Sequence, residues 1–168
     1  MKRLMSAVAA AAIFASMGVG AAEARNRTVI NQTGYANATA SAQNGDRNGA
    51  VANQTGRRHY SRGVQDGYNN FLRMDQYGTR NHASTTQLGN NNFAATGQEG
   101  RALRADTLQT GNGNVAGVAQ IGNGSRAVTD QDGRNNTSGI IQVGNNQDVE
   151  VRQRGEGNIS VVVQSGYN

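Results

Sequence analysis

The chain of 168 residues contains no cysteine, no proline and no tryptophan, and only 5 tyrosines and 3 phenylalanines. Without cysteine the protein cannot form disulfides, although a secreted protein would be free to use them. Hydrophobic residues make up 36% of the chain, below the roughly 45–50% of ordinary globular proteins. This composition argues against a conventional core of large apolar side chains.

Charge is also sparse, at 16% of the residues with a formal net charge of +5. After residue 24 every basic residue is arginine, and the arginines are interleaved with Asp and Glu along the sequence. Scattered charge indicates a solvated surface, so we expect no specific nucleic-acid partner, whereas an acidic polymer or surface stays open as a weak partner. The histidines, His59 and His82, have no cysteine or clustered carboxylates beside them, so we expect no enzyme, metal site or cofactor.

The first residues have the pattern of a secretory signal peptide. Lys2 and Arg3 precede the apolar run 4–19, which is followed by Ala-Glu-Ala at 22–24. The run is short for a membrane-spanning helix, and an Ala-x-Ala site indicates cleavage between Ala24 and Arg25. The sequence therefore predicts a signal peptide over residues 1–24 and one domain over residues 25–168.

An eleven-residue repeat runs through that domain without an insertion, which argues against disorder and should be read before any local element. Glutamine occupies every eleventh position, and glycine follows two residues after each. The glutamines are Gln32, Gln43, Gln54, Gln65, Gln76, Gln87, Gln98, Gln109, Gln120, Gln131, Gln142, Gln153 and Gln164. The glycines are Gly34, Gly45, Gly56, Gly67, Gly78, Gly89, Gly100, Gly111, Gly122, Gly133, Gly144, Gly155 and Gly166.

Asparagine dominates the fifth position after each glutamine, except at His59, Leu103, Ser125 and Gln147. These asparagines are Asn26, Asn37, Asn48, Asn70, Asn81, Asn92, Asn114, Asn136 and Asn158. The seventh position is mostly Ala or Ser, and the ninth mostly Thr, Val or Ile. Positions five, seven, nine and the next glutamine alternate, so they share one face of a strand. None of them carries Asp, Glu, Lys or Arg, which separates an inside from an outside.

This pattern predicts an all-β fold, because the regular glycines and asparagines would weaken a helix. We expect seven-residue strands, from 26–32 to 158–164, joined by four-residue turns. Two strands then form a 22-residue rung, and stacked rungs form a two-sided, amyloid-like β-solenoid. Thirteen strands give a stack about 31 Å tall. We expect buried amides to form ladders between rungs, and the glycines to adopt positive φ in the turns.

The ends of the repeat look open, since it enters a strand beside Arg25 and finishes with the charge-free strand "ISVVVQ". Open complementary ends predict a head-to-tail filament. The alternative is a monomeric secreted solenoid that binds an extracellular polymer or surface through outward apolar residues such as Phe71 and Phe93. Calcium-binding nonapeptides are absent from the sequence, and the mixed outward residues do not suit an ice-binding array.

At these residues the chain resembles the curlin family, the subunits of curli-type bacterial amyloid fibres. The family half-repeat Gln-x-Gly-x-x-Asn-x-Ala-x-x-x-Gln is intact in the four units that begin at Gln43, Gln76, Gln87 and Gln109. The resemblance extends over residues 26–168, because the other units match partly.

The resemblance implies a secreted, cofactor-free fibre subunit at the bacterial cell surface that serves adhesion and biofilm formation. Its partners would be further copies or related curlin subunits, an outer-membrane export pore and periplasmic helper proteins. The many arginines look more like a minor, nucleating subunit than a major one. The family's major subunit has a non-repeat segment after its signal, whereas here the repeats start beside Arg25.

Overall fold

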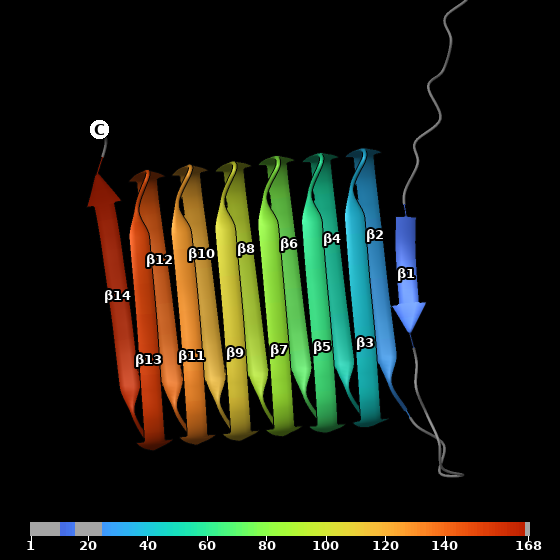
Figure 1. The fold of residues 1–168 in the computed structure, drawn as a ribbon, viewed down its shortest axis with the longest axis vertical. Helices are drawn as coiled ribbons and strands as arrows, with labels where there is room; N and C mark the ends of the chain where they lie inside the picture. The colour runs from blue at the N-terminus through green and yellow to red at the C-terminus, as the bar shows by residue number, and fades with distance from the viewer. Residues whose placement is uncertain (1–10, 16–24, 167–168) are drawn as a thin grey trace, which may run out of the picture.

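The computed structural model describes residues 11–15 and 25–166, and within them all regular secondary structure is β-strand (Figure 1). The strands are β1 Ala11–Ala15, β2 Arg27–Tyr35, β3 Ala38–Asp46, β4 Gly49–Arg57, β5 Tyr60–Tyr68, β6 Phe71–Thr79, β7 His82–Asn90, β8 Phe93–Arg101, β9 Arg104–Asn112, β10 Val115–Asn123, β11 Arg126–Arg134, β12 Thr137–Asn145, β13 Asp148–Glu156 and β14 Ile159–Gly166.

Alternate strands belong to two parallel sheets that face each other. The odd strands from β1 to β13 form one sheet, here called sheet A, and the even strands from β2 to β14 form the other, sheet B. From β2 to β12 the strand residues pair with the residues 22 positions later, as Gln109 does with Gln131. The predicted two-sided β-solenoid with 22-residue rungs is therefore confirmed, and Figure 1 shows its rungs stacked in chain order.

The strands are longer and the connections shorter than predicted. β2 to β13 each contain 9 residues rather than seven, and only two residues, such as Ala36 and Asn37, join one strand to the next. Each strand bends at its repeat glycine, and these glycines are aligned from rung to rung. The pairing between rungs therefore continues through the bend, as the pairing of Gly111 with Gly133 shows. A bend shared by all rungs therefore does not end a parallel ladder.

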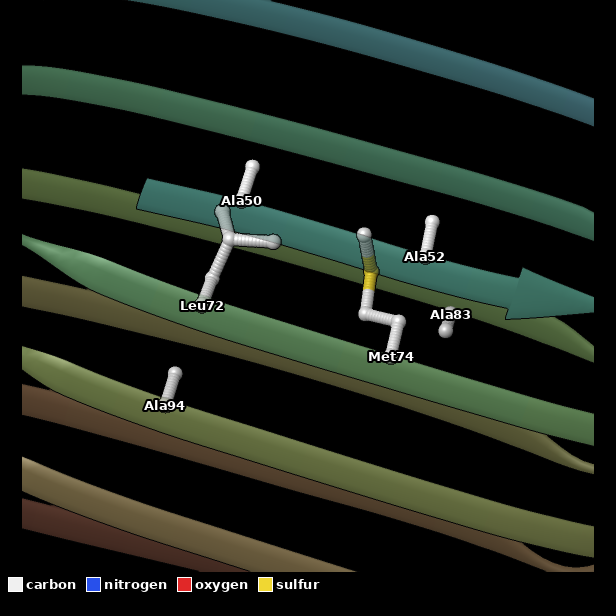
Figure 2. Close-up of a cluster of buried hydrophobic side chains, with 6 residues drawn as sticks. All are labelled: Ala50, Ala52, Leu72, Met74, Ala83 and Ala94. Atoms are coloured by element: carbon white, nitrogen blue, oxygen red, sulfur yellow. The ribbon is translucent and has the colours of Figure 1, made fainter. Parts of the chain in front are cut away.

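Side chains alternate between a narrow interior and the solvent along every strand, as the sequence pattern requires. Figure 2 shows the interior near β4 and β6, where Leu72 and Met74 lie among alanines of both sheets. Gly63 of sheet A lies opposite them, and a Cβ atom there would be 3.0 Å from a Leu72 methyl group. Large side chains on one wall thus fill the space that small residues leave on the other.

A second apolar cluster fills the later rungs. Val118 and Ile140 of sheet B pack with Val149 and Val151 of sheet A. The same interior buries hydroxyl groups, and those of Thr85, Thr129 and Ser138 have no hydrogen-bond partner. The interior is therefore a mixture of small apolar and polar side chains rather than a conventional apolar core.

Strand β1 lies outside the repeat. Its five residues belong to the predicted signal peptide, and they pair in parallel with Ala38–Ala42 of β3 at the edge of sheet A. The predicted cleavage residue Ala24 falls outside the described residues, whereas Arg25 lies at their start and its backbone N–H donates to Asp46 Oδ1 at 2.8 Å.

Candidate assembly surface

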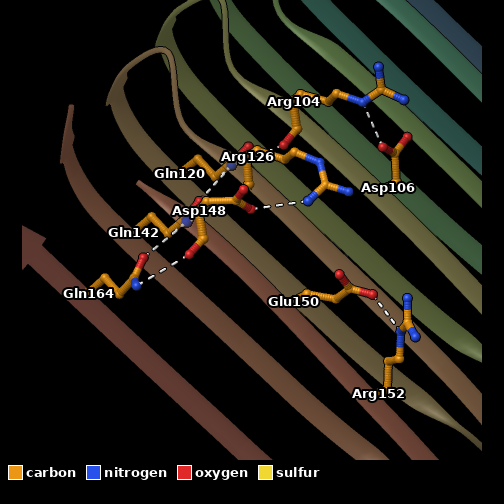
Figure 3. Close-up of polar contacts among 9 residues, drawn as sticks. All are labelled: Arg104, Asp106, Gln120, Arg126, Gln142, Asp148, Glu150, Arg152 and Gln164. Atoms are coloured by element: carbon orange, nitrogen blue, oxygen red, sulfur yellow. Dashed lines mark hydrogen bonds and ion pairs between the residues drawn. The ribbon is translucent and has the colours of Figure 1, made fainter. Parts of the chain in front are cut away.

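The glutamines of the repeat form two continuous columns, one in each sheet. All eleven steps of 22 residues carry a hydrogen bond from Nε2 of one glutamine to Oε1 of the next, at 2.7–3.3 Å. Figure 3 shows the last steps in sheet B, from Gln120 through Gln142 to Gln164. At a net contribution of about 1 kcal/mol each, these bonds together stabilise the stack by on the order of 10 kcal/mol.

Each glutamine also links the two sheets. The Nε2 group of Gln109 in β9 donates to the backbone carbonyl oxygen of Phe93 in β8 at 3.0 Å, and Gln131 repeats this contact with Val115. An amide nitrogen has two hydrogens, so both are used in the interior. This second bond fixes the distance between the sheets at every rung.

The glutamine columns have a direction. Every step runs from a donor in the earlier rung to an acceptor in the later rung, as from Gln109 to Gln131. At the end formed by β13 and β14, Gln153 and Gln164 therefore have no later glutamine to receive their Nε2 donors. At the opposite end, Gln32 and Gln43 have no earlier glutamine to donate to their Oε1 atoms. The two ends of the stack are complementary in hydrogen bonding.

The asparagine columns form the expected amide-to-amide ladder only in part. The Nδ2 groups of Asn70, Asn136 and Asn158 donate to Oδ1 of the asparagine one rung earlier at 2.9–3.2 Å, and the remaining contacts are to the backbone. Asn92 Oδ1 accepts the backbone N–H of Asn114 at 3.0 Å, and Asn114 repeats this contact with Asn136 at 3.1 Å. The Asn114 Nδ2 group donates to the carbonyl oxygen of Gly133 at 3.1 Å. The same arrangement recurs at Asn26, Asn37, Asn48, Asn70, Asn81 and Asn136. Asn158 donates its backbone N–H to Asn136 Oδ1 and its Nδ2 to the Arg154 carbonyl oxygen. These side chains mainly satisfy the backbone of the tight connections.

The polar residues that replace asparagine keep part of this role, whereas Leu103 is a buried apolar side chain. His59 is buried, its Nδ1 accepts the backbone N–H of Asn81 at 3.3 Å, and its Nε2 lies 3.2 Å from the Thr55 carbonyl oxygen. Burial lowers the pKa of His59 from its ordinary 6.5, in agreement with a neutral ring that accepts at Nδ1. Ser125 accepts the N–H of Gln147 at 3.2 Å.

The repeat glycines allow the rungs to approach closely. Gly111 has φ of +107°, and a Cβ atom built on it would lie 2.0 Å from the carbonyl oxygen of Gly133 in the next rung. Positive φ applies to the glycines from Gly34 to Gly155. The structure thus places them where both the backbone conformation and the neighbouring rung disfavour a side chain.

The last strand is more exposed than the strands of the interior rungs, where Phe93 and Val115, the equivalents of Ile159, are 41% and 39% exposed. Outward-facing Ile159 and Val161 of β14 are 78% and 66% exposed. The inward-facing Val162 is only half-buried, whereas Ile140, its neighbour in β12, is 1% exposed. Among residues 25–166 no strand pairs with the outer side of β14, so its backbone N–H and C=O groups form an open edge. Open edges of this kind template the addition of further strands.

One buried acceptor near this end lacks a donor. The Oε1 atom of Gln147, the residue immediately before β13, is buried without a hydrogen-bond partner. In the equivalent position of earlier rungs, the acceptor receives the backbone N–H of the residue 22 positions later, as Ser125 does from Gln147. The donor missing at Gln147 is therefore the backbone of one more strand.

Ion pairs lie on the outer face of sheet A (Figure 3). Arg104 pairs with Asp106 at 2.7 Å and Arg126 with Asp148 at 3.1 Å, and Glu150 pairs with Arg152. The aromatic pairs Tyr60–His82 and Phe71–Phe93 stack on the outer faces of sheets A and B. The pKa of His82 is lowered, first by burial and then by Arg104. These contacts lie between neighbouring rungs or along single strands.

Sequence reasoning missed a cluster of arginines. Arg57, Arg58, Arg80 and Arg101 are interleaved with acids along the chain, but the solenoid gathers them along one edge. Sorting the turn residues by a period of 22 rather than 11 would have separated the two edges and revealed the cluster.

The described residues contain no group of three or more His, Cys, Asp or Glu side chains that could hold a metal ion. Nor do these described residues form a helix with the length and apolar character needed to cross a membrane. Their surface hollows are shallow and lie on the sheet faces and edges, as the one lined by Gly97, Gly117 and Gly139 does. The geometry is that of a structural scaffold with open edges.

Comparison with known proteins finds one protein family whose sequence model matches part of this solenoid. A family model described as "Curlin associated repeat" matches residues 126–155, which include β11 and β12. No curated protein and no solved structure matches the chain. Within the matched segment and beside it, the strands pair in the 22-residue register found in the rest of the described solenoid.

Proposed function

This chain is a curlin-repeat protein, and on that premise we propose that it is the structural subunit of an extracellular, curli-like amyloid fibre that grows head to tail. The observation that carries the proposal is the complementarity of the two ends. Gln153 and Gln164 offer donors at one end, and Gln32 and Gln43 offer acceptors at the other, so one copy continues the ladders of the next.

The number of strands sets how a second copy joins. Both β2 and β14 belong to sheet B, so the next free position in the spiral lies in sheet A, above β13. A second copy fills it when it is turned by half a revolution about the stack, so that its β2 extends β13 and its β3 extends β14. In this register the backbone N–H of Asn26 in the second copy reaches the unpaired Oε1 of Gln147.

The finer parts of the proposal follow from the family resemblance. We propose that residues 1–24 are removed on secretion, that the fibre lies on the bacterial cell surface, and that it supports adhesion and biofilm formation. An outer-membrane pore with periplasmic helpers would export the chain, and related curlin subunits could join it. The abundance of arginine favours a minor, nucleating subunit.

The first test follows assembly of the protein after release from denaturant. Amyloid-dye fluorescence should rise after a lag that preformed seed abolishes, and fibre diffraction should show reflections near 4.7 and 10 Å, the spacings between strands and between sheets. A protein that stays monomeric, β-rich and dye-negative would refute fibre formation. It would favour the alternative, a secreted solenoid that binds a polymer through exposed residues such as Phe71 and Phe93.

The half-turn register has its own test, because the chain has no cysteine. Asn31→Cys combined with Arg152→Cys places the two thiols on neighbouring strands of different copies only if β2 adds to β13. Asn31→Cys combined with Val163→Cys does so only if β2 adds to β14. Neighbouring strands lie about 4.8 Å apart, within the Cα separations that disulfides bridge. If disulfide-linked oligomers form only in Asn31→Cys/Val163→Cys, the half-turn register is wrong although the protein still forms fibres.

A further inference from the structure

One edge of the solenoid carries arginine without any acidic residue. This edge, called here the arginine edge, consists of the last residue of each even strand from β2 to β12 and the two residues that follow it, here called together the turn residues. Its turn residues include Arg57, Arg58, Arg80 and Arg101, and none is Asp or Glu. On the opposite edge the charged turn residues are Asp46, Arg47, Arg134 and Glu156, which cancel.

Backbone hydrogen bonds hold the arginine edge in register. The Arg58 N–H donates to the Tyr35 carbonyl oxygen at 2.9 Å, and the Arg80 N–H donates to the Arg57 carbonyl oxygen at 2.9 Å. Successive turns therefore stack at about the 4.8 Å spacing of the strands. Arg58 and Arg80 are neighbours in one column, and Arg57 and Arg101 lie on either side of Thr79 in the other.

These arginines are exposed and have no acidic partner. Among the described residues no salt bridge involves any of the four, whereas Arg73 pairs with Asp75 at 2.6 Å on the outer face of sheet B. A hollow of about 460 Å³ runs between them, lined by Tyr35, Arg57, Arg58, Thr79, Arg80 and Arg101. It offers four guanidinium groups, a phenol and a hydroxyl, and no acceptor carboxylate.

The arrangement has a cost. Arg58 and Arg80 adopt φ of 57° and 59°, a left-handed conformation that side chains other than Asn rarely take. Seven other turns place Asn or Gly in this position, namely Asn69, Asn91, Asn135, Asn146, Gly113, Gly124 and Gly157. Like charges on neighbouring rungs also repel. A bound anion would offset the repulsion.

We propose that the arginine edge binds a linear polyanion through its phosphate or sulfate groups. A guanidinium group presents paired donors that match two oxygens of a tetrahedral oxyanion, and the four arginines lie in two adjacent columns over three rungs. A polymer can contact several at once, whereas a single small anion cannot. This inference does not depend on fibre formation, since the edge is complete within one copy.

The test measures binding of fluorescently labelled inorganic polyphosphate and dextran sulfate to the full-length chain by anisotropy. The variant Arg58→Asn/Arg80→Asn removes two arginines but keeps a residue suited to the turn. The matched control, Arg47→Asn/Arg134→Asn, removes two arginines from the opposite edge, where Asn also occurs naturally at both positions, as in Asn90 and Asn91. Circular dichroism should show the same β content for all three proteins.

We expect the first variant to bind at least one of the two polymers about tenfold more weakly, which equals about 1.4 kcal/mol, and the control to change affinity less than about twofold. Which polymer the first variant loses identifies the anion as phosphate or sulfate. Equal losses in both variants would mean that only net charge matters and would overturn the proposal. Stronger binding of single-stranded DNA that is lost in Tyr35→Ala, but not in the arginine variant, would also overturn it, because base stacking would then carry the affinity.

Discussion

At the scale of single residues, the repeat glycines do two things at once. Positive φ alone would make a larger residue costly at Gly111, and the Gly133 carbonyl leaves no room for even one carbon. The sequence predicts the first effect, because glycine recurs in turns. The second depends on the distance between rungs, which no spacing in the sequence reveals.

Gly111→Ala should therefore destabilise the solenoid by more than the roughly 1–3 kcal/mol expected from backbone strain alone, because two rungs must also separate. Gly157→Ala serves as a control, since its φ is +69° but nothing lies within 4 Å of the added carbon. Gly97→Ala has neither a positive φ nor a contact and should be close to neutral. Denaturant unfolding of the three variants gives the comparison, and similar losses for Gly111→Ala and Gly157→Ala would contradict the role of rung spacing.

His59 shows how one residue substitutes for another chemically. The neutral ring accepts from Asn81 and lies beside the Thr55 carbonyl, as an asparagine amide would. Its place in the asparagine column was readable from the sequence, but the tautomer and the lowered pKa depend on burial.

This arrangement predicts a pH dependence. Because the native pKa of His59 lies below 6.5, the unfolded chain binds more protons between the two values. The stability contributed by His59 should be complete above pH 6.5 and should fall as the pH drops below 6.5 towards the lowered native pKa. His59→Asn should remove that part of the dependence. Unfolding free energies of both chains from pH 8 to pH 4 test this, and His82 is present in both, so its contribution cancels. Parallel curves would refute the prediction.

At the scale of the strand, the alternation of inward and outward residues was fully predictable, because no charge occurs at an inward position. The length of the strands was not. Gly and its following residue read as a turn, yet Gly111 and Asn112 remain paired with Gly133 and Arg134. A sequence shows where a chain bends, but not that all its neighbours bend together.

The unpaired hydroxyl of Thr129 in β11 gives a prediction at this scale. Thr129 is 0% exposed, its Oγ1 has no partner, and its neighbour in β13 is Val151. Thr129→Val should stabilise the protein by about 1 kcal/mol, because an unsatisfied buried polar group is removed.

Thr39→Val in β3 is the matched control, since Thr39 is also buried but its hydroxyl lies 2.8 Å from that of Ser61 and donates to Gln54 at 3.1 Å. This change should destabilise by about 1–3 kcal/mol. Thermal or denaturant unfolding of both variants decides the matter, and a loss of stability in Thr129→Val would indicate that its hydroxyl has a partner in solution.

At the scale of the whole molecule, β1 occupies the edge of β3 that an adjoining copy would use. If the leader is retained, its strand competes with β14 of the neighbour. We therefore expect residues 25–168 to polymerise after a shorter lag than the full-length chain at equal concentration.

The measurement is amyloid-dye kinetics of both proteins without seed, and seeded elongation serves as the control for folding competence. A variant of the full chain with Ile13→Pro, which cannot sustain central strand pairing, should behave like residues 25–168. Equal lags for all three proteins would show that β1 does not obstruct the edge.

The arginine edge belongs to this scale as well, because it exists only once alternate turns are sorted to opposite sides. Arg57, Arg58, Arg80 and Arg101 are separated along the chain by Asp66, Asp75 and Glu99, which the fold directs to the outer faces of the sheets. Basic and acidic residues that alternate along the sequence can thus lie on different surfaces of the folded protein.

The odd number of strands in the repeat, which leaves both β2 and β14 in sheet B, gives the proposed fibre a twofold screw. Each copy advances about 31 Å and turns by 180°, so the fibre repeats only after two copies, or about 62 Å. Arginine edges would then alternate between its two flanks. A polyanion running along one flank would meet a binding patch in every second copy, and a second polyanion could bind the other flank equally well. Such a fibre would cross-link anionic strands into a network instead of carrying a single one along its length.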